Sequence, residues 1–263
     1  MLNREKIIEN LKDVKNKVVI MSGKGGVGKS TISTYLGLSL SKEKKRVGLL
    51  DCDFHGPTIP KLLGIERFKP EVLGDKILPI EFDEYFRVLS IAFFLQSTED
   101  AVIWRGPLKI GAIRQFLEEV HWGNLDFLLF DLPPGTGDEP LTIAQLIPPP
   151  VHCIIVTTPQ EVALTSVRKS INFAKKLKMN ILGIVENMSG LTCPHCGKDI
   201  PFFKKGGGEK CAMDLKIPYL GGIPFDLDLM SSSDSGKPIF YLSEDKKAKA
   251  PIMEIGKKIQ NIL

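Results

Sequence analysis

The chain has 263 residues, of which 43% are hydrophobic and 25% are charged, so it is long enough for one large α/β domain or two small ones. Its formal net charge of +4 is too small to indicate nucleic acid as a partner, and no apolar run is long enough for a membrane-spanning helix, so we expect no membrane partner either. Five cysteines, an odd number, argue against a disulfide framework, and the N-terminus lacks a signal-peptide pattern, so we expect a cytoplasmic protein.

Taken in chain order, short apolar runs alternate with segments of helical periodicity. A short amphipathic segment leads, and helices are expected between many of the strands, as at residues 30–40 and 161–176. The alternation predicts an α/β fold with a mainly parallel sheet and helices on both faces, whose ligands bind at the carboxyl ends of the strands. Strands are predicted at residues 17–22, 46–51, 86–92, 125–131, 152–157, 181–187 and 218–223.

The sequence shows no internal repeat and no linker, so we expect a single domain over residues 1–263. Residues 188–212 are the clearest insertion, because they carry a cysteine pair, two adjacent phenylalanines and a glycine run. A C-terminal helix is expected at about 248–263, with isoleucines at helical spacing. That helix resembles an amphipathic membrane anchor, but few lysines accompany it, which favours a last helix that closes the core.

A phosphate-binding loop follows the first predicted strand. Gly23, four further residues and then Gly28-Lys29-Ser30 have the Walker A spacing, which places the lysine and serine at a helix N-terminus. The glycines also fit a dinucleotide motif, but such a site has no use for Lys29 and Ser30. We therefore predict a nucleoside triphosphate site formed by Gly23, Lys24, Gly25, Gly26, Val27, Gly28, Lys29, Ser30 and Thr31.

Hydrolysis of a phosphoanhydride needs charge neutralisation, a metal ion and an oriented water. Lys29 is the candidate for holding the phosphates, and Ser30 for ligating Mg²⁺. Asp131 ends an apolar strand, as a Walker B aspartate does, and is expected to support the metal through a water. Asp51 and Asp53 follow the second strand; Asp53 is the preferred candidate for orienting water, and a turn or helix-capping role is the alternative for both.

Cys193-Pro-His-Cys196 has the spacing of a metal-binding knuckle. The sequence contains no second C-x-x-C, so a four-thiolate site needs a symmetric partner chain. Such a site suits Zn²⁺ or a [4Fe–4S] cluster, and a redox dithiol is a further alternative. The nearby run 206–210 is interpreted as a flexible hinge followed by a helix start.

Five motifs in order resemble the Mrp/ApbC group of iron–sulfur cluster carrier ATPases. They are Lys-Gly-Gly-Val-Gly-Lys-Ser, Asp-Cys-Asp-Phe-His-Gly-Pro, Asp-Leu-Pro-Pro-Gly-Thr-Gly-Asp, Asn-Met-Ser and Cys-Pro-His-Cys, and they span nearly the whole chain. That group belongs to the deviant Walker A (SIMIBI) class of P-loop NTPases, with MinD, ParA and the nitrogenase iron protein. The resemblance implies a homodimeric, slow ATPase that uses ATP and Mg²⁺ and transfers a bridging [4Fe–4S] cluster to apo iron–sulfur proteins, with Zn²⁺ possible in aerobic samples.

The resemblance also implies roles for individual residues. Lys24 would reach across the dimer to the partner's nucleotide, Asp53 would position water and Asp131 would support Mg²⁺. Asn187 and the Pro224 region would contact adenine. The alternatives left open are a positioning switch like MinD or ParA, a nucleotide-binding scaffold that does not hydrolyse, and a dimer bridged by structural zinc.

Overall fold

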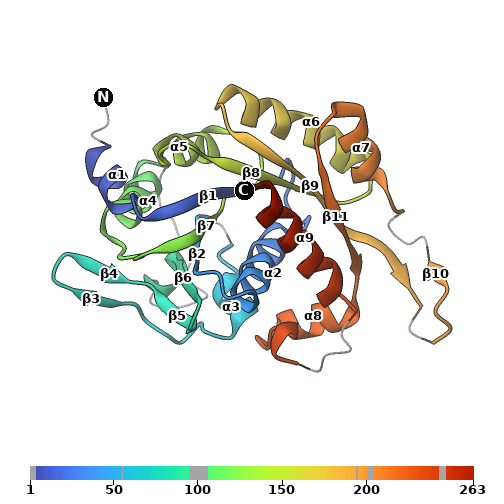
Figure 1. Cartoon of the computed structure of the whole chain (residues 1–263), viewed down its shortest axis with the longest axis horizontal. Coiled ribbons are helices and arrows are strands. Elements are labelled where there is room, and N and C mark those ends of the chain that lie inside the picture. Colours follow the sequence, from blue (N-terminus) through green and yellow to red (C-terminus); the bar gives the residue numbers. More distant parts are fainter. Residues whose placement is uncertain (1–3, 55, 95–105, 194, 201–203, 243–246) are drawn as a thin grey trace.

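The computed structural model describes residues 4–54, 56–94, 106–193, 195–200, 204–242 and 247–263. Its sheet has the strand order β10-β9-β8-β1-β7-β2-β6-β5, and β11 pairs with β9 beside this path (Figure 1). The pairs from β9 through to β6 are parallel, as is the pair of β11 with β9. These strands are β1 (Val14–Met21), β2 (Val47–Asp51), β6 (Phe86–Ser90), β7 (Leu125–Asp131), β8 (His152–Thr157), β9 (Asn180–Thr192) and β11 (Tyr219–Phe225).

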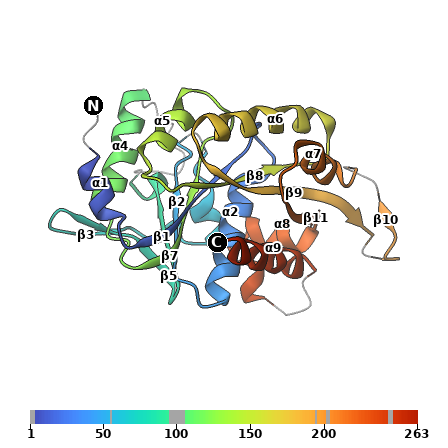
Figure 2. The same cartoon turned by 45° about the horizontal axis from the view of Figure 1, so that its top comes forward.

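Helices cover both faces of this sheet (Figures 1 and 2). On one face α2 (Lys29–Lys42) packs against α9 (Lys249–Ile262) and α3 (Ile59–Leu63), and α3 packs against α8 (Leu227–Asp234). The other face carries α1 (Glu5–Asn10), α4 (Gly106–Glu119), α5 (Asp138–Leu146), α6 (Glu161–Lys176) and α7 (Gly207–Leu215). The predicted fold class, a mainly parallel sheet with helices on both faces, is therefore confirmed.

The central strands form because their sequences are apolar on both sides, as buried parallel strands require. Residues 18–21 of β1 are all buried, and so is the whole of β2. The register places Asp51 at the end of β2 directly beside Asp131 at the end of β7. Both aspartates thus lie at the carboxyl edge of the sheet, where β1 leads into the phosphate loop.

The elements that the sequence did not predict are short antiparallel strands. At one edge of the sheet β5 (Ile80–Asp83) pairs with β6, and β3 (Glu71–Leu73) forms a separate hairpin with β4 (Lys76–Leu78). At the other edge β10 (Asp199–Ile200) pairs with the end of β9. Runs this short carry too little periodicity to stand out in a sequence.

The C-terminal helix α9 packs against α2 and β11. Ile252, Ile255 and Ile259 are no more than 3% exposed, whereas Ile262 is 49% exposed. The apolar face is therefore used in the core, which contradicts the membrane-anchor alternative and agrees with a helix that closes the core. Across the described residues, we find no helix with the length and hydropathy that a membrane span requires.

We call the described part of the insertion, residues 188–193, 195–200 and 204–205, the cysteine arm; it leaves the body along the end of β9, and β10 pairs back onto that end. Cys193 and Cys196 lie between these two strands. In both views the arm extends from one end of the molecule, and the β3–β4 hairpin extends from the opposite end (Figures 1 and 2).

Candidate functional site

The loop between β1 and α2 adopts a conformation that only glycine provides cheaply. Gly26 has φ 78° and Gly28 has φ 81°, both in the left-handed region. A Cβ atom at Gly23 would overlap the carbonyl group of Ser166 in α6, and one at Gly28 would overlap the side-chain amide of Asn187. Gly23, Gly26 and Gly28, three of the four glycines in the predicted motif, are thus required by backbone conformation or by close packing.

Behind the loop, the Asp131 carboxylate binds three side chains from the first turns of α2. Lys29 Nζ lies 2.7 Å from Asp131 Oδ2, and the Ser30 hydroxyl donates to the same oxygen at 2.6 Å. Ser33 donates to Asp131 Oδ1 at 2.6 Å. Asp131 is fully buried and Lys29 is 6% exposed, so this ion pair is shielded from water. Lys29, Ser30 and Asp131 were predicted from the sequence, whereas Ser33 was not.

This donor set fits a magnesium ion. Mg²⁺ prefers oxygen ligands, usually one or two protein groups together with phosphate oxygens and water. A serine hydroxyl and a buried carboxylate lie together at the start of α2, next to the loop amides that would face phosphate. The residues that would hold Mg²⁺ are therefore Ser30 directly and Asp131 behind it.

The two aspartates after β2 have different environments. Asp51 is fully buried, and its carboxylate accepts hydrogen bonds from the Ser90 hydroxyl and from the backbone N–H of Asp53. Burial, and next the nearby Asp131 charge, raise the pKa of Asp51 to about 8. For Asp51 the turn-forming alternative is confirmed.

Asp53, in contrast, is only half-buried and lines a cavity of about 600 Å³. The same cavity is lined by the segment after Asp131, including Pro133, Gly137 and Asp138. The preferred candidate for orienting water therefore lines the same cavity as the segment that directly follows Asp131. Its catalytic role stays a prediction.

Lys24 lies on the exposed outer side of the loop. Its carbonyl oxygen accepts a hydrogen bond from Ser22 Oγ at 3.0 Å, which fixes the backbone at this point. Val27 and Lys29 are buried, so the two lysines of the loop occupy opposite environments. A solvent-facing Lys24 agrees with the predicted reach toward a partner chain, and that role remains a prediction.

Asn187 and Pro224 lie on the neighbouring strands β9 and β11. Asn187 is 5% exposed, and its side-chain amide donates to the Val27 carbonyl at 3.0 Å. The register pairs Asn187 with Ile223, next to Pro224, which lines a cavity of about 720 Å³. Both residues thus lie close to the phosphate loop side of the sheet, and their predicted adenine contact stays a prediction.

In the cysteine arm, Cys193 is half-buried and Cys196 is exposed. The backbone closes a tight turn here, since Cys193 donates to Lys198 at 2.9 Å and Gly197 donates to Cys193 at 3.0 Å. The N–H groups of Cys196 and His195, together with the Cys196 thiol, lower the pKa of Cys193. This favours the thiolate, which is the form that ligates metal.

The remaining three cysteines are poorly placed to ligate a metal ion. Cys52, Cys153 and Cys211 are buried, and burial raises the pKa of each thiol. The described residues include no group of three or more His, Cys, Asp or Glu side chains arranged for a metal ion. The paired phenylalanines of the insertion, 202 and 203, lie outside the described residues. Within the described chain, the knuckle therefore offers two thiols and needs further ligands from elsewhere.

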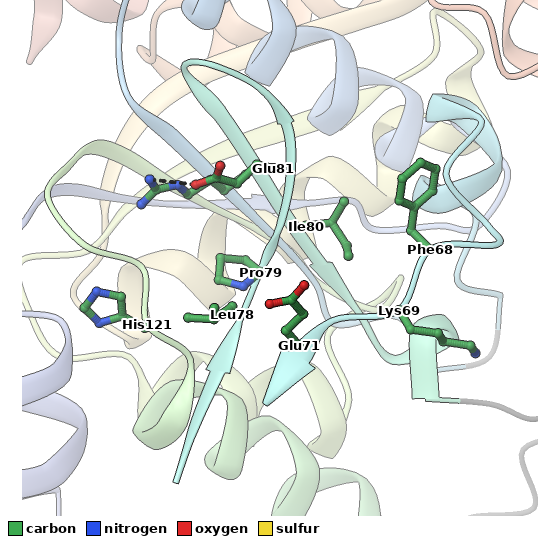
Figure 3. Close-up of a pocket in the computed structure, with 9 residues that line it drawn as sticks. Phe68, Lys69, Glu71, Leu78, Pro79, Ile80, Glu81 and His121 are labelled. Atoms are coloured by element: carbon green, nitrogen blue, oxygen red, sulfur yellow. Dashed lines mark ion pairs between the residues drawn. The ribbon is translucent and has the colours of Figure 1, made fainter. Parts of the chain in front are cut away.

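A further cavity of about 460 Å³ lies between the β3–β4 hairpin and the edge strand β5 (Figure 3). Its rim carries an ion pair between Glu81 and Arg87 at 2.9 Å, with His121 nearby. None of the predicted site residues lines it. It lies at the end of the molecule opposite the cysteine arm, and it is not part of the candidate site.

A strand, a glycine loop and a helix that carries a buried lysine–aspartate pair at the carboxyl ends of parallel strands define the class of P-loop NTPases. Within that class, the ParA family model, described as NUBPL iron-transfer P-loop NTPase, matches residues 13–260. The chain belongs to this family.

Relatives of known name agree. The chain is 50% identical over 254 residues to an iron-sulfur cluster carrier protein of Methanocaldococcus jannaschii, covering 97% of this chain and 87% of that one. It is 44% identical over 257 residues to a cytosolic Fe-S cluster assembly factor NUBP2 homolog of Nematostella vectensis, covering 96% and 95%. These matches confirm the resemblance to iron–sulfur cluster carriers.

Solved structures give the same fold. A nucleotide-binding protein of Archaeoglobus fulgidus, solved in complex with ADP and with cobalt, superimposes with a TM-score of 0.81 at 41% identity, covering 93% of this chain and 96% of that one. The cell division ATPase MinD of Pyrococcus furiosus superimposes with a TM-score of 0.70 at 24% identity, covering 95% and 100%. The second likeness is one of fold alone.

Proposed function

We propose that this protein is a homodimeric ATPase that binds a [4Fe–4S] cluster between its two protomers and transfers it to apo-proteins. The observation that carries the proposal is the combination, in one chain, of a P-loop site with a Cys193/Cys196 pair, half-buried and exposed respectively, that has no further ligand among the described residues. The relatives' names, iron-sulfur cluster carrier protein and Fe-S cluster assembly factor, give the cargo its chemical class.

At the nucleotide site, Mg²⁺ supplies charge neutralisation at the terminal phosphates. The loop N–H groups and Lys29 would bind the phosphates, and Ser30 and Asp131 would hold the metal. In the structure Lys29 forms an ion pair with Asp131. On nucleotide binding the lysine would exchange this carboxylate for the phosphate group. Asp53 accepts a proton from, or orients, the attacking water in the cavity it shares with the segment 133–140.

Lys24 would complete the site of the partner protomer. Each loop already holds its own buried lysine, so a second cation raises the rate most if it arrives only when two protomers close together. An exposed lysine on the outer side of the loop is suitably placed for this. Nucleotide binding and dimer closure would then be linked.

At the cysteine end, two knuckles related by a two-fold axis would supply four thiolates to one cluster. Cys193 is biased toward the thiolate by its neighbouring N–H groups, and Cys196 is accessible from solvent. An exposed, shared site suits cargo that must leave, whereas structural metal sites are closed.

The test is anaerobic reconstitution with iron and sulfide, with mass and cluster absorbance measured on the same sample. We expect about one [4Fe–4S] cluster per dimer. The Cys193→Ala/Cys196→Ala double variant should lose the cluster, while the matched control Cys211→Ala, a buried cysteine in α7, should keep it.

Cluster absorbance that survives in the double variant would contradict the assignment. Uptake of zinc alone, with no cluster under anaerobic conditions, would favour a structural zinc bridge instead. Transfer is then scored by mixing the loaded dimer with an apo-protein that acquires activity only with a [4Fe–4S] cluster.

A further inference from the structure

A single buried carboxylate, Glu186, closes the base of the cysteine arm. It is fully buried on β9, and it accepts hydrogen bonds from the Ser189 hydroxyl and from the backbone N–H groups of Gly206 and Gly208. Ser189 lies where the arm leaves the body, and the two glycines lie where it returns. Both ends of the arm are therefore fastened to one side chain.

The glycines at this point are present because of close packing. A Cβ atom at Gly207 would overlap the Pro159 carbonyl, and one at Gly208 would lie 3.0 Å from Glu186 Oε2. Gly206 has φ 80° and caps the N-terminus of α7. The expected helix start is found, but the run is held in contact with Glu186 and Pro159, which contradicts the expectation of a flexible hinge.

The carboxylate is compensated by hydrogen bonds and by the helix N-terminus. Its hydrogen-bond donors are a hydroxyl and two backbone N–H groups, and no ion pair to it is found among the described residues. The positive end of the α7 dipole adds to these bonds. A buried carboxylate is costly without such donors. We call residues 204–215 the arm base, and we expect the arm base to move together with Glu186 so that these hydrogen bonds are kept.

The residue next to Glu186 contacts the phosphate loop. Asn187 donates to the Val27 carbonyl at 3.0 Å, so adjacent positions of β9 hold the loop on one side and the arm base on the other. A second path runs through α6, whose Ser166 carbonyl packs against Gly23, while Pro159, just before this helix, packs against Gly207. Loop and arm are thus joined by short, fully packed connections.

We propose that Glu186 is a positioning residue that transmits the nucleotide state of the phosphate loop to the cysteine arm. A displacement of Val27 on phosphate binding moves Asn187, and the strand carries the movement to the Glu186 contacts with Gly206 and Gly208. The arm then changes its orientation relative to the sheet, and with it the position of the Cys193/Cys196 pair. This inference rests on the proposed function for its biological meaning, but its mechanics involve no cluster.

The experiment is amide hydrogen exchange on the full-length apo protein with and without Mg²⁺ and the non-hydrolysable analogue AMPPNP. The informative peptides cover the phosphate loop and the arm base at residues 204–215. In the wild type we expect the analogue to slow exchange in the loop and to change it in the arm base.

Glu186→Gln keeps the shape of the side chain but places an amide against N–H donors. In this variant the arm base should exchange about tenfold faster without nucleotide and should no longer respond to AMPPNP, while the loop responds as in the wild type. Ser189→Ala, which removes one donor and is safer for folding, should change the arm base in the same direction. The control Glu209→Gln alters an exposed carboxylate in the first turn of the same helix and should behave as the wild type.

An arm base that ignores AMPPNP in the wild type, or still responds in Glu186→Gln and Ser189→Ala, would overturn the inference. Cluster uptake measured in parallel separates the two proposals. Arm-base coupling without cluster uptake would leave the inference standing and remove the carrier function, and uptake without coupling would do the reverse. If neither the loop peptide nor the arm-base peptide of the wild type responds to AMPPNP, the arm base is not coupled to the nucleotide state, and the inference is overturned.

Discussion

Ser33 is a site residue that no motif contains. Its hydroxyl donates to Asp131 Oδ1 at 2.6 Å, and the two residues are 98 positions apart in the chain. Replacing Ser33 by alanine leaves one carboxylate oxygen without this donor, so we expect unfolding free energy to fall by about 1–3 kcal/mol. ATP turnover should fall several-fold with little change in KM, because Lys29 and Ser30 remain. Denaturant unfolding and steady-state hydrolysis measure the two effects.

The same helix offers a matched control for Ser33. Ser39 is also buried, but its hydroxyl has no hydrogen-bond partner in the part of the chain that the structure describes. Ser39→Ala should therefore be neutral or slightly stabilising, and turnover should stay at the wild-type level. Equal losses of stability in the two variants would show that the bond to Asp131 contributes nothing specific.

Gly26 and Gly28 separate backbone strain from packing. Both have positive φ, but a Cβ at Gly26 meets nothing within 4 Å, whereas one at Gly28 overlaps the Asn187 amide. Gly26→Ala should cost about 1–2 kcal/mol, the penalty of a left-handed alanine. Gly28→Ala should cost more and abolish nucleotide binding, and Asn187→Ala in the same chain should recover part of the stability. Equal costs for the two glycines would contradict the packing argument.

The sequence predicted those site residues whose roles depend on local spacing. Lys29 and Ser30 belong to the loop motif, and Asp131 ends an apolar strand, so each is visible within a few residues of sequence. Ser33 and Glu186 were not predicted, because their roles depend on contacts between elements. An isolated serine or glutamate has no distinguishing sequence pattern. The sequence already favoured Asp53 over Asp51 for orienting water, and the structure adds that Asp51 is buried in a turn, while the role of Asp53 stays a prediction.

At the scale of elements, long apolar strands and amphipathic helices were predictable. The periodicity of residues 161–176 matches α6 at both ends, and all the predicted parallel strands are present. The short strands β3, β4, β5 and β10 were missed, since each has four residues or fewer. The glycine run at 206–208 was misread as a hinge because composition does not reveal what packs against a glycine.

The C-terminal helix gives a prediction at the same scale. Ile255 is 3% exposed between α2 and β11, so Ile255→Ala should lower the unfolding free energy by about 2–5 kcal/mol. Ile262 is 49% exposed, and Ile262→Ala should change it by about 0.5 kcal/mol or less. Sedimentation with anionic liposomes should be absent for all three proteins with and without ATP. If the wild type binds liposomes in the presence of ATP and Ile262→Ala does not, the C-terminal helix is a membrane anchor after all.

At the scale of the whole molecule, two features lack complements within one described chain. The cysteine pair lacks further metal ligands among the described residues, and Lys24 is exposed whereas the Lys29–Asp131 pair of the same site is buried. A two-fold axis would repeat both features and bring each copy to the other. The proposed dimer therefore accounts for both with one assumption, and it makes a prediction that a monomeric ATPase does not.

If Lys24 acts on the partner's nucleotide, two inactive variants should restore activity when mixed. Lys24→Ala and Lys29→Ala should each hydrolyse ATP poorly as homodimers. In a mixed dimer, the Lys24→Ala protomer keeps its own Lys29 and receives an intact Lys24 from its partner. That dimer then has one complete site.

Random exchange of equal amounts would make half of the dimers mixed, so the mixture should reach about a quarter of wild-type turnover. The control is a mixture in which the second protomer carries both substitutions, because it supplies neither lysine and should restore nothing. If Lys24 serves its own loop, every site in the first mixture lacks one lysine and activity stays at the level of the separate variants. In that case only the cysteine pair would still support the dimer, and the proposed link between nucleotide binding and dimer closure would be wrong.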